Sequence, residues 1–527
     1  MRRVTLGVVG AGVLGFLGVF FLWPVVAIVG RGLGAGGFAD VLVEPGTWRL
    51  VAFTFGQAAA ATAVALLAGL PVAYLLARLE VPGKPVLRAL IAVPFVLPTI
   101  VVGMAFRAVL GADAGVWAIV LANAFFNVAV VARTVGGLWA HLDRRAEDAA
   151  RSLGASRLRA FGSVTLPALM PALGSAAAVV FLFCATSFGV VLVLGGGRYR
   201  TLETEIYLRT VQLLDLSGAA ALSLLQVAAV LAALLLAAVA RRRREAALRL
   251  RAAEETTRPP RGAEWLVVGL TGLVVAGLLT PIVGLLLRSV SGRDGWSLAG
   301  WRGLLGTGED GTLQVSGLEA ALNSVRAAFD ATCLALLVGL LAAAVLVAAR
   351  RRFAEVLDAA LMLPLGVSAV TLGFGYLITL HLLPGDLRTS PLLVPFAQAL
   401  VVTPLVVRMV LPVLRAIDDR LRQAAATLGA GPWRVRREID LPLALRSVGA
   451  AAGFGFVVAL GEFGATSFLA RPEAATLPVA IARLISRPGE LNTQLAYAAC
   501  ALLMLVTVLV VLAVERLRVR GGSLGEF

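Results

Sequence analysis

The sequence has few charged residues: aspartate, glutamate, lysine and arginine together make up 15% of it, whereas 59% of its residues are hydrophobic. Soluble globular domains carry about 25% charged residues. The mean hydropathy of +0.91 is also far above that class. This shortage of charge excludes a soluble domain and indicates an integral membrane protein.

Lysine and histidine are nearly absent, with Lys84 the only lysine and His141 and His381 the only histidines. A P-loop needs glycine, four residues and then Gly-Lys-Ser/Thr, but around the only lysine Arg78 takes the place of the first glycine and Pro85 that of the hydroxyl residue. We therefore expect no nucleotide site, and any ATP hydrolysis requires a separate subunit. The two histidines lie far apart, so we expect no metal, cofactor or catalytic site.

Cysteine is scarce as well. Cys184, Cys333 and Cys500 all lie within apolar runs and lack the spacing of metal ligands or of a disulfide framework. We therefore predict that all three are small buried hydrophobic residues.

Long apolar runs are abundant instead. About twelve segments reach the length of roughly 20 residues that a membrane-spanning helix needs, from Leu6–Val29 to Leu495–Val514. They include Leu87–Leu110, Pro171–Leu194, Val356–Leu380 and Val448–Ala470. The first is too long for a signal peptide and no cleavage site follows it. The net charge of +16 comes from short arginine runs between the spans rather than from one basic face, so it does not indicate nucleic-acid binding. The positive-inside rule places these runs and both termini in the cytoplasm of a multi-pass cell-membrane protein.

The chain also repeats itself. One constant shift in register maps Gly154 onto Gly429, and it also maps one Leu-Pro pair onto another. Earlier in each half a slightly smaller shift maps Gly103 onto Gly373. A constant register over a long stretch indicates duplication. The expected fold is all-α, with about twelve transmembrane helices in two homologous halves that point the same way across the membrane.

The halves are separated by a polar, arginine-rich stretch that predicts a solvated cytoplasmic linker. We place the first half at 1–240, the linker at 241–263 and the second half at 264–527. Each half contains one repeated charged loop, at 141–170 and at 416–445.

The repeated loop reads as a short amphipathic helix, with its alanines and a leucine on one face and its charged residues toward water. The glycine after it permits a tight turn or a close helix contact, and the Leu-Pro pair begins the next span. Such a knob suits a groove in another protein. The candidate residues of the first loop are Glu147, Asp148, Ala149, Ala150, Gly154, Leu166 and Pro167.

This pattern of an acidic residue, two alanines, a glycine and Leu-Pro resembles the EAA loop of permease subunits of binding-protein-dependent ABC importers. The resemblance implies a type I importer permease fold, in which each loop is a coupling helix seated in a cleft of an ATPase subunit. It also implies a pair of identical ATPase subunits in the cytoplasm and a solute-binding protein outside. The second loop matches in Gln423, Ala424, Ala425, Gly429, Leu441 and Pro442.

The second loop departs from the family pattern at its acidic position. Arg422 stands where the first loop has Glu147, and Gln423 stands where it has Asp148. In that family the acidic residue contributes to the contact with the ATPase. The resemblance therefore implies two coupling contacts that are electrostatically unequal.

The segment CATSFGVVLVLGGGRYRTLETEIY is similar to the corresponding part of thiamine-transport permeases, which are also fused two-half chains. It favours thiamine or a thiamine-like compound as the solute. Ferric iron is the main alternative, followed by other small ions and polyamines. An ion-coupled secondary transporter or a non-transporting scaffold also fits twelve spans, but neither explains a loop that occurs twice.

Polar residues inside the spans are candidates for the translocation path. Glu462 needs a reason, because a charge at the middle of a bilayer costs about 2.5–3.5 kcal/mol on insertion scales. It either lines the path of a cationic solute or serves as a structural carboxylate that pairs with an arginine or caps a broken helix. Thr186, Ser187, Thr466 and Ser467 either offer hydroxyls to the solute or allow close helix packing.

Two arginines recur in register near cytoplasmic span ends, at Arg133 and Arg408. Their long side chains can extend to the lipid headgroups. Alternatively, they pair with Asp143 and Asp418 at the base of the loops. The sequence leaves both interpretations open.

Overall fold

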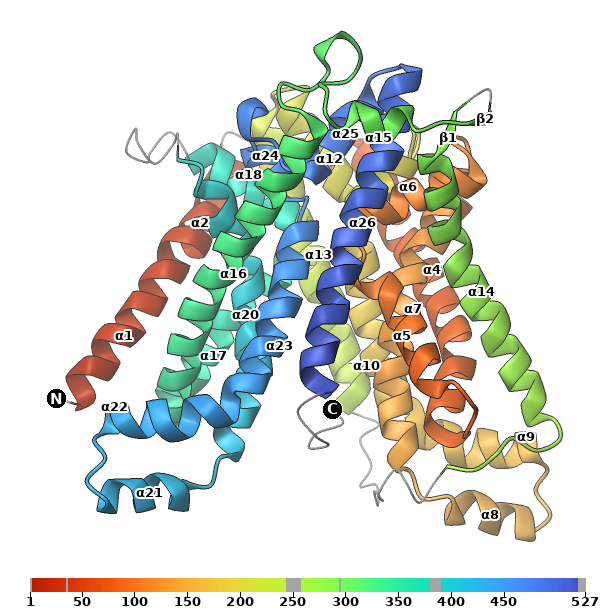
Figure 1. Ribbon diagram of the computed structural model, residues 1–527, viewed down its shortest axis with the longest axis vertical. Helices are drawn as coiled ribbons and strands as arrows, with labels where there is room; N and C mark the ends of the chain where they lie inside the picture. Colours follow the sequence, from red (N-terminus) through yellow and green to blue (C-terminus); the bar gives the residue numbers. More distant parts are fainter. Residues whose placement is uncertain (1, 35–36, 243–256, 293–294, 380–389, 520–527) are drawn as a thin grey trace. The chain divides into compact units, whose positions relative to one another are not determined.

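The computed structural model describes residues 2–34, 37–242, 257–292, 295–379 and 390–519. Within these ranges the chain is almost entirely helical, and the strands are limited to β1 (Ser291–Gly292) and β2 (Gly295–Trp296), which pair antiparallel. Figure 1 shows the long helices and the two short strands. The predicted all-α fold is therefore confirmed.

The chain packs as two compact units that do not follow the order of the sequence. Unit 1 contains Met1–Ala39, Ile206–Leu224 and Ser289–Phe527. Its helices are α1 (Arg2–Leu17), η1 (Gly18–Leu22), α2 (Trp23–Leu33), α15 (Ala299–Gly303), η5 (Glu309–Gly311), α16 (Gly317–Ala348), α17 (Arg351–Gly366), α18 (Ala369–Thr379), α20 (Leu393–Ala416), α21 (Asp419–Thr427), α22 (Pro432–Val435), η7 (Arg436–Asp440), α23 (Leu441–Gly461), α24 (Thr466–Leu469), η8 (Pro472–Ala474), α25 (Leu477–Ser486) and α26 (Glu490–Val519).

Unit 2 contains Asp40–Glu205 and Leu225–Arg288. Its helices are α4 (Pro45–Arg78), α5 (Lys84–Val96), α6 (Thr99–Leu110), α7 (Gly115–His141), α8 (Arg145–Ser152), α9 (Arg157–Ala160), η3 (Phe161–Thr165), α10 (Leu166–Ala185), α11 (Gly189–Leu194) and α14 (Glu264–Ser289). The last residue of α14, Ser289, falls in unit 1, and three further helices cross the boundaries between the units: α3 (Gly37–Val43), α12 (Leu202–Val211) and α13 (Leu216–Arg242). The opening span of each sequence half thus packs with the helices of the other half.

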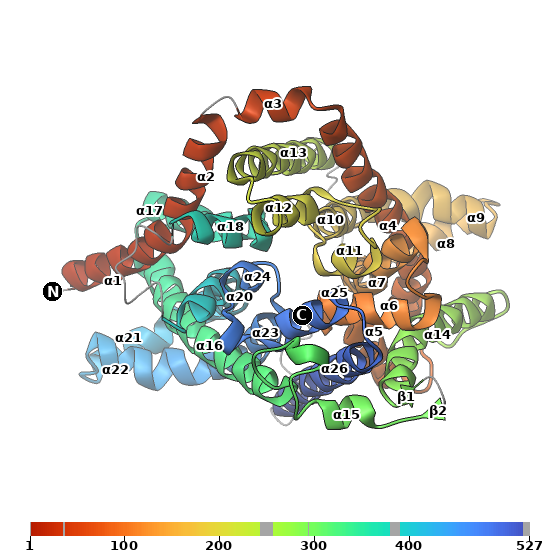
Figure 2. The same ribbon diagram turned by 90° about the horizontal axis from the view of Figure 1, so that it is seen from above.

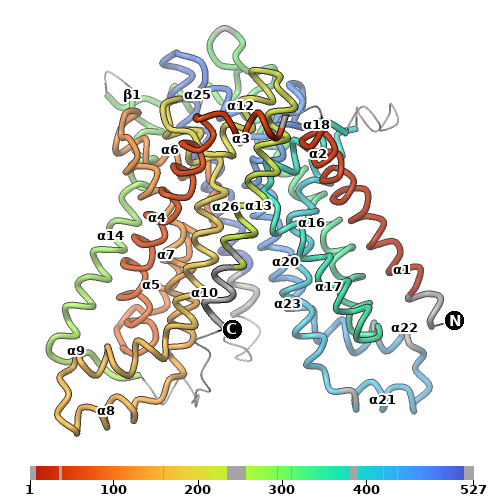
Figure 3. The backbone as a smooth tube through the Cα atoms, turned by 180° about the vertical axis from the view of Figure 1, so that it is seen from behind, coloured from red at the N-terminus to blue at the C-terminus, as the bar shows by residue number. Residues whose placement is uncertain are grey.

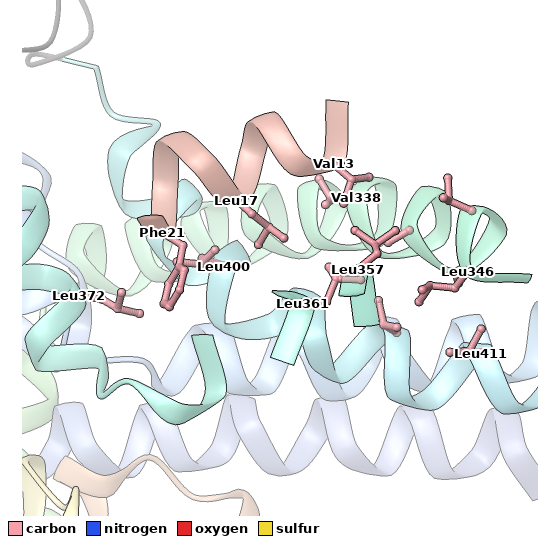
Figure 4. Packing of buried hydrophobic residues seen from close by; sticks show 14 of the residues in the cluster. Val13, Leu17, Phe21, Val338, Leu346, Leu357, Leu361, Leu372, Leu400 and Leu411 are labelled. Atoms are coloured by element: carbon pink, nitrogen blue, oxygen red, sulfur yellow. The ribbon is translucent and has the colours of Figure 1, made fainter. Parts of the chain in front are cut away.

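In unit 1 the core shows how the first span packs with helices of the second sequence half. Leu17 and Phe21 of the first span are buried in one cluster with Leu400 of α20, and Figure 4 shows their side chains on the side of the span that faces this helix. The Tyr376 hydroxyl of α18 donates a hydrogen bond to the backbone oxygen of Phe20 at 2.5 Å. The first span is therefore fixed to the second half by packing and by a hydrogen bond.

In unit 2 the helix α14 occupies the corresponding place. Figure 2 shows it next to α6, and its Arg288 Nε donates to the backbone oxygen of Ala108 at 3.5 Å. At the other end of α14, Glu264 accepts a hydrogen bond from the hydroxyl of Tyr74 at 2.8 Å. Both ends of the helix are thus bound to unit 2.

The described end of the predicted linker is also fixed. The Arg258 guanidinium lies 2.6 Å from the Glu264 carboxylate, and the Arg258 N–H donates to the backbone oxygen of Arg78 at 3.2 Å. The linker is therefore anchored to unit 2 at Arg258, although four of the residues 257–263 are exposed to solvent, and 243–256 lies outside the described residues.

Close packing between the long helices uses small residues in both units. A Cβ atom on Gly69 of α4 would lie 2.6 Å from Val131 of α7, and one on Gly339 of α16 would lie 2.7 Å from Val406 of α20. The two pairs occupy matching register positions in the two halves. Small residues let membrane helices approach closely, so these glycines allow α4 to pack tightly on α7 and α16 to pack tightly on α20.

Ten helices of the described chain are long and apolar enough to cross a membrane, or up to twelve if each of two bent pairs counts as one span. The pair α5 and α6 bends by 104°, and the pair α17 and α18 bends by 95°. The number of spans agrees with the prediction. The predicted spans Leu87–Leu110 and Val356–Leu380 each contain one of these bends, and Leu380 lies outside the described residues.

The two breaks have local causes. Leu97 precedes Pro98 and has an extended backbone, because a residue before proline disfavours the helical region. In the second pair Ser368 begins the new helix, and its hydroxyl accepts a hydrogen bond from the Thr371 N–H at 3.0 Å.

Two other predicted spans run past a helix end. The segment Pro171–Leu194 was expected to be continuous, but α10 ends at Ala185 and α11 starts at Gly189. The segment Val448–Ala470 was also expected to be continuous, but α23 ends at Gly461 and α24 starts at Thr466. Hydropathy does not register these breaks, because apolar residues continue on both sides of each one.

Candidate functional site

Each repeated loop is a short helical hairpin that projects from two long helices of its own unit. Figure 1 shows α8 and α9 beyond the ends of α7 and α10, and it shows α21 and α22 beyond the ends of α20 and α23. A π-helical turn, η3 or η7, joins each hairpin directly to the next long helix. The hairpin and the long helix that follows it are therefore continuous in the backbone.

The glycine of each loop ends its first short helix. Gly154 has φ +89° and Gly429 has φ +84°, a left-handed conformation that other residues adopt at a cost. The Gly154 N–H donates to Arg151 and the Ala155 N–H donates to Ala150, which is the Schellman arrangement, and the second loop repeats it. Space around the would-be Cβ atoms is open. Of the two predicted reasons for glycine, the tight turn is therefore confirmed, and no other part of the described chain approaches either glycine closely.

The residue before each glycine is a nearly fully exposed leucine. Leu153 is 90% exposed and Leu428 is 89% exposed. Single exposed apolar residues are ordinary, but these two occupy the same register at the tips of both hairpins. The sequence prediction placed Leu153 on an apolar face and did not single out Leu428, although the constant register pairs them.

In the first loop, Glu147 turns inward instead of facing water as predicted. It is half-buried, and its Oε2 accepts a hydrogen bond from the Thr165 hydroxyl at 3.1 Å. Asp148 and Ala149 are exposed and Ala150 is half-buried.

In the second loop, Arg422 occupies the inward position. Its Nε donates to the Asp440 carboxylate at 2.8 Å, and its Nη2 donates to the backbone oxygen of Leu414 at 2.9 Å. Gln423 and Ala424 are exposed, as Asp148 and Ala149 are in the first loop. The sequence prediction identified the arginine but missed its partners.

The Leu-Pro pairs lie where the sequence predicts. Pro167 and Pro442 are in the first turns of α10 and α23, where the missing N–H of proline breaks no helical hydrogen bond.

The arginines near the span ends were given two interpretations. Arg408 lies 3.7 Å from Asp358 of α17, so its predicted pairing with Asp418 is wrong. Asp418 instead caps α21 by accepting a hydrogen bond from the Arg420 N–H at 2.9 Å. Asp143 accepts a similar hydrogen bond from the Arg145 N–H at 3.0 Å, and Arg133 is exposed on α7.

Glu462 lies at the break between α23 and α24. Its carboxylate accepts hydrogen bonds from the Ala465 N–H at 2.7 Å and the Thr466 N–H at 3.1 Å, and also one from the Thr466 hydroxyl. The side chain therefore caps the broken helix, which was one of the two structural explanations predicted for it. The residue is buried, at 8% exposure.

The other candidate hydroxyls differ in their bonding. The hydroxyls of Thr186 and Ser467 donate to the backbone oxygens of Leu182 at 2.9 Å and Gly464 at 2.7 Å. The buried hydroxyl of Ser187 has no hydrogen-bond partner in the described part of the chain. Among the predicted path residues, Ser187 therefore presents the hydroxyl that is available to another group.

A buried amide cluster was missed by sequence reasoning. Gln57 Nε2 donates to the backbone oxygen of Cys184 at 2.8 Å, and Asn123 Nδ2 donates to Gln57 Oε1 at 2.9 Å. Asn127 Nδ2 lies 3.4 Å from the Cys184 sulfur. The signal was present, since three amides inside apolar runs need partners in a membrane.

The scarce metal-binding residue types do not gather. Cys184 and Cys500 are buried as predicted, whereas Cys333 is exposed, so that prediction is wrong for Cys333. His381 lies outside the described residues. Within the described ranges, no group of three or more histidine, cysteine, aspartate or glutamate side chains is placed to hold a metal ion.

Comparison with known proteins gives two kinds of match. The family described as "Binding-protein-dependent transport system inner membrane component" matches twice, at 65–245 and 335–520. The chain is 26% identical over 495 residues to the thiamine transport system permease protein ThiP of Brucella abortus (strain 2308), covering 87% of this chain and 86% of that protein. It is also 26% identical over 493 residues to ThiP of Escherichia coli (strain K12), covering 89% of each.

A third relative matches a shorter stretch. The molybdenum transport system permease protein ModB of Haemophilus influenzae is 47% identical over 96 residues, which is 18% of this chain and 42% of that protein.

The two family matches lie one in each sequence half and include both hairpin loops. They confirm the resemblance inferred from the loops, and they identify a multi-pass inner membrane permease, the component of an ABC importer that forms the membrane path and is not itself an enzyme. The chain belongs to the family of binding-protein-dependent transport system inner membrane components.

Proposed function

We propose that this permease carries thiamine or a thiamine-like compound into the cell. The single observation that carries this proposal is the similarity to ThiP proteins, which extends over nearly the whole of both chains. Similarity to the molybdenum permease is higher but covers a small part of the chain. A shared segment is expected between permeases of different solutes, whereas likeness over both halves supports a shared solute.

The partners follow from the family and from the hairpins. A binding-protein-dependent permease works with ATPase subunits and a solute-binding protein. We place a pair of identical ATPase subunits on the hairpins, each with a cleft that receives the exposed leucine at one tip. The proposed contact residues are Glu147, Asp148, Ala149, Ala150, Gly154, Leu166, Pro167, Gln423, Ala424, Ala425, Gly429, Leu441 and Pro442.

The same arrangement supports an orientation for the N-terminus. Figure 3 shows the start of α1 at the end of unit 1 from which α21 and α22 project. If the hairpins meet ATPase subunits in the cytoplasm, this end of α1 is cytoplasmic too. That agrees with the arginine distribution along the chain.

The proposed mechanism is alternating access. Closure of the ATPase subunits on ATP displaces the hairpins, and each hairpin displaces the long helices to which it is joined. ATP-driven closure can shift the equilibrium between the inward-open and outward-open permease only by the difference in free energy with which the closed ATPase pair binds the two states. Hydrolysis and product release then restore the other state.

The translocation path is proposed to pass the two helix breaks. Ser187 and Glu462 occupy the same register position in the two halves, and each lies between a long helix and a short one. We include Thr186, Thr466 and Ser467 because they flank these breaks. A carboxylate on one side favours a cationic solute such as thiamine.

The test is identification of the solute that the partner binding protein holds, followed by reconstitution. The chain, its ATPase and its binding protein are placed in lipid vesicles, and uptake of labelled thiamine is measured with and without ATP. We expect uptake that requires all three components. Saturable uptake of ferric iron or molybdate without thiamine uptake would contradict the proposed solute, and uptake by the permease alone would contradict the importer mechanism.

A further inference from the structure

The two hairpins contain one contact at the same register with different charges. In the first, the Glu147 carboxylate meets the Thr165 hydroxyl. In the second, the Arg422 guanidinium meets the Asp440 carboxylate. Both members of the contact occupy matching register positions, so the pair is an acid with a hydroxyl in the first half and a base with an acid in the second.

Arg422 also binds the end of the preceding long helix. Its Nη2 and Nη1 donate to the backbone oxygens of Leu414 at 2.9 Å and Ile417 at 3.5 Å. The last carbonyl groups of a helix lack partners within it and carry partial negative charge, so a guanidinium suits them.

In the first half, another arginine does this. Arg78 at the end of α4 donates through Nη2 to the backbone oxygen of Leu142 at 2.9 Å, and Leu142 is the counterpart of Ile417. By the smaller register shift that applies early in each half, the counterpart of Arg78 is Ala348. The guanidinium that covers the helix end thus comes from α4 in one half and from the hairpin helix itself in the other.

The charged neighbours of the two arginines differ as well. Arg78 lies within electrostatic range of Arg144 as well as of Glu147 and Asp143, whereas Arg422 forms a direct ion pair with Asp440. The Arg422 and Asp440 side chains are only 21% and 19% exposed. A pair so screened from water contributes more than a surface ion pair, and loss of one member leaves the other poorly solvated.

We propose that Arg422 is the positioning residue of the second coupling hairpin. Its guanidinium joins α21, the end of α20 and the base of α23, and so does alone what Arg78 and Glu147 do together in the first half. Because the guanidinium is bound within the hairpin, it is not part of the contact with the ATPase. This inference rests on the coupling role in the proposed function.

The experiment uses the full chain reconstituted with its ATPase and binding protein. Four forms are compared: the unaltered chain, R422E, R422E/D440T, and R422E/D440T/A348R, which rebuilds the chemistry of the first half in the second. The readouts are the initial uptake rate, the ATP hydrolysed per solute imported, and the amount of ATPase that copurifies.

We expect R422E to lower uptake at least about tenfold, because it places two carboxylates together and exposes the carbonyls of α20; a tenfold change corresponds to about 1.4 kcal/mol. R422E/D440T should recover part of the loss, and the triple variant should come within about twofold of the unaltered chain. A merely destabilising substitution would not be rescued by two further changes. Copurification of the ATPase should change little in the triple variant.

Uptake by R422E within twofold of the unaltered chain would overturn the inference, as would a triple variant no better than R422E at equal membrane content. If R422E does not reach the membrane, D440T tests the inference instead. This variant keeps the bonds from Arg422 to the carbonyl groups and removes its ion pair, so uptake should fall about threefold. Unchanged uptake by D440T would overturn the role of the Arg422–Asp440 pair. Absence of ATP-dependent uptake in the unaltered chain would contradict the proposed function before any variant is compared.

Discussion

The two halves use the same kind of side chain to hold the start of a short helix. They use different side chains where a long helix ends. The Thr54 hydroxyl accepts a hydrogen bond from the Leu202 N–H at 3.0 Å, and the Ser324 hydroxyl accepts one from the Leu477 N–H at 2.7 Å. Both members of these pairs occupy matching positions in the two halves, by the smaller shift for the hydroxyl and the larger shift for the N–H. They hold the first residues of α12 and α25 in the same way in both halves.

At the broken spans, the halves use different side chains. In the first half Gln57 satisfies the backbone oxygen of Cys184 near the end of α10. In the second half Glu462 satisfies the N–H groups at the start of α24. The hairpins differ in the same manner. Both halves therefore give partners to backbone groups beside the break, because an unpaired group inside a membrane is costly, but they satisfy different backbone groups with different side chains.

The largest expected effect tests whether the hairpin tips are equivalent. Leu153→Asp and Leu428→Asp should each weaken binding of the ATPase, since burying a leucine stabilises a contact by about 1.5–3 kcal/mol. We expect a similar loss from either variant in a copurification assay. The matched control is Leu121→Asn, an exposed leucine on α7 away from the hairpin, which should leave copurification unchanged. Unequal losses would show that the tips differ although their exposure is the same.

A second effect separates the two breaks. Glu462→Ala removes the partners of two buried N–H groups and should destabilise the protein by about 1–3 kcal/mol. Ser187→Ala, at the same register, should have almost no effect because its hydroxyl has no partner in the described chain. Thermal unfolding of the purified protein measures both.

Glu462→Gln keeps an acceptor for the helix cap and removes the charge. If the carboxylate attracts the solute, this variant should lower uptake of a cation more than it lowers stability. Equal destabilisation by Glu462→Ala and Ser187→Ala would contradict the proposed difference between the breaks.

A third effect concerns the turn. Gly154→Val and Gly429→Val place a side chain in the left-handed region, at a cost of about 1–2 kcal/mol, which should distort the hairpin without preventing insertion. We expect ATP hydrolysis that is no longer matched by uptake. Gly162→Ala, in the same hairpin but with an ordinary backbone and open space, should behave as the unaltered chain. Normal uptake in both valine variants would refute the coupling role.

The smallest effect tests the shared hydroxyls. Thr54→Val and Ser324→Ala each remove one side-chain acceptor from a backbone N–H, so each should lower stability by about 0.5–1.5 kcal/mol. The two losses should be equal within error in denaturation experiments on the purified protein. A loss in one half alone would show that the matching geometry hides unequal roles.

Several features of the fold and of the site could be predicted from the sequence because they depend on local order along the chain. Apolar runs gave the number of spans, and a constant register gave the duplication. The glycine and Leu-Pro positions gave the loops. The break before Pro98 also had a local signal that span counting overlooked.

The sequence by itself determined that this is a duplicated, all-helical membrane protein with two projecting hairpins. Only the tertiary structure decided which faces meet: that the first span joins the second half, that Cys333 is exposed and that Arg422 binds Asp440 and two helix-end carbonyls. The physical reason is that in a membrane protein the lipid-facing and the protein-facing sides of a helix are both apolar. Hydropathy therefore identifies the helices but does not distinguish their contacts.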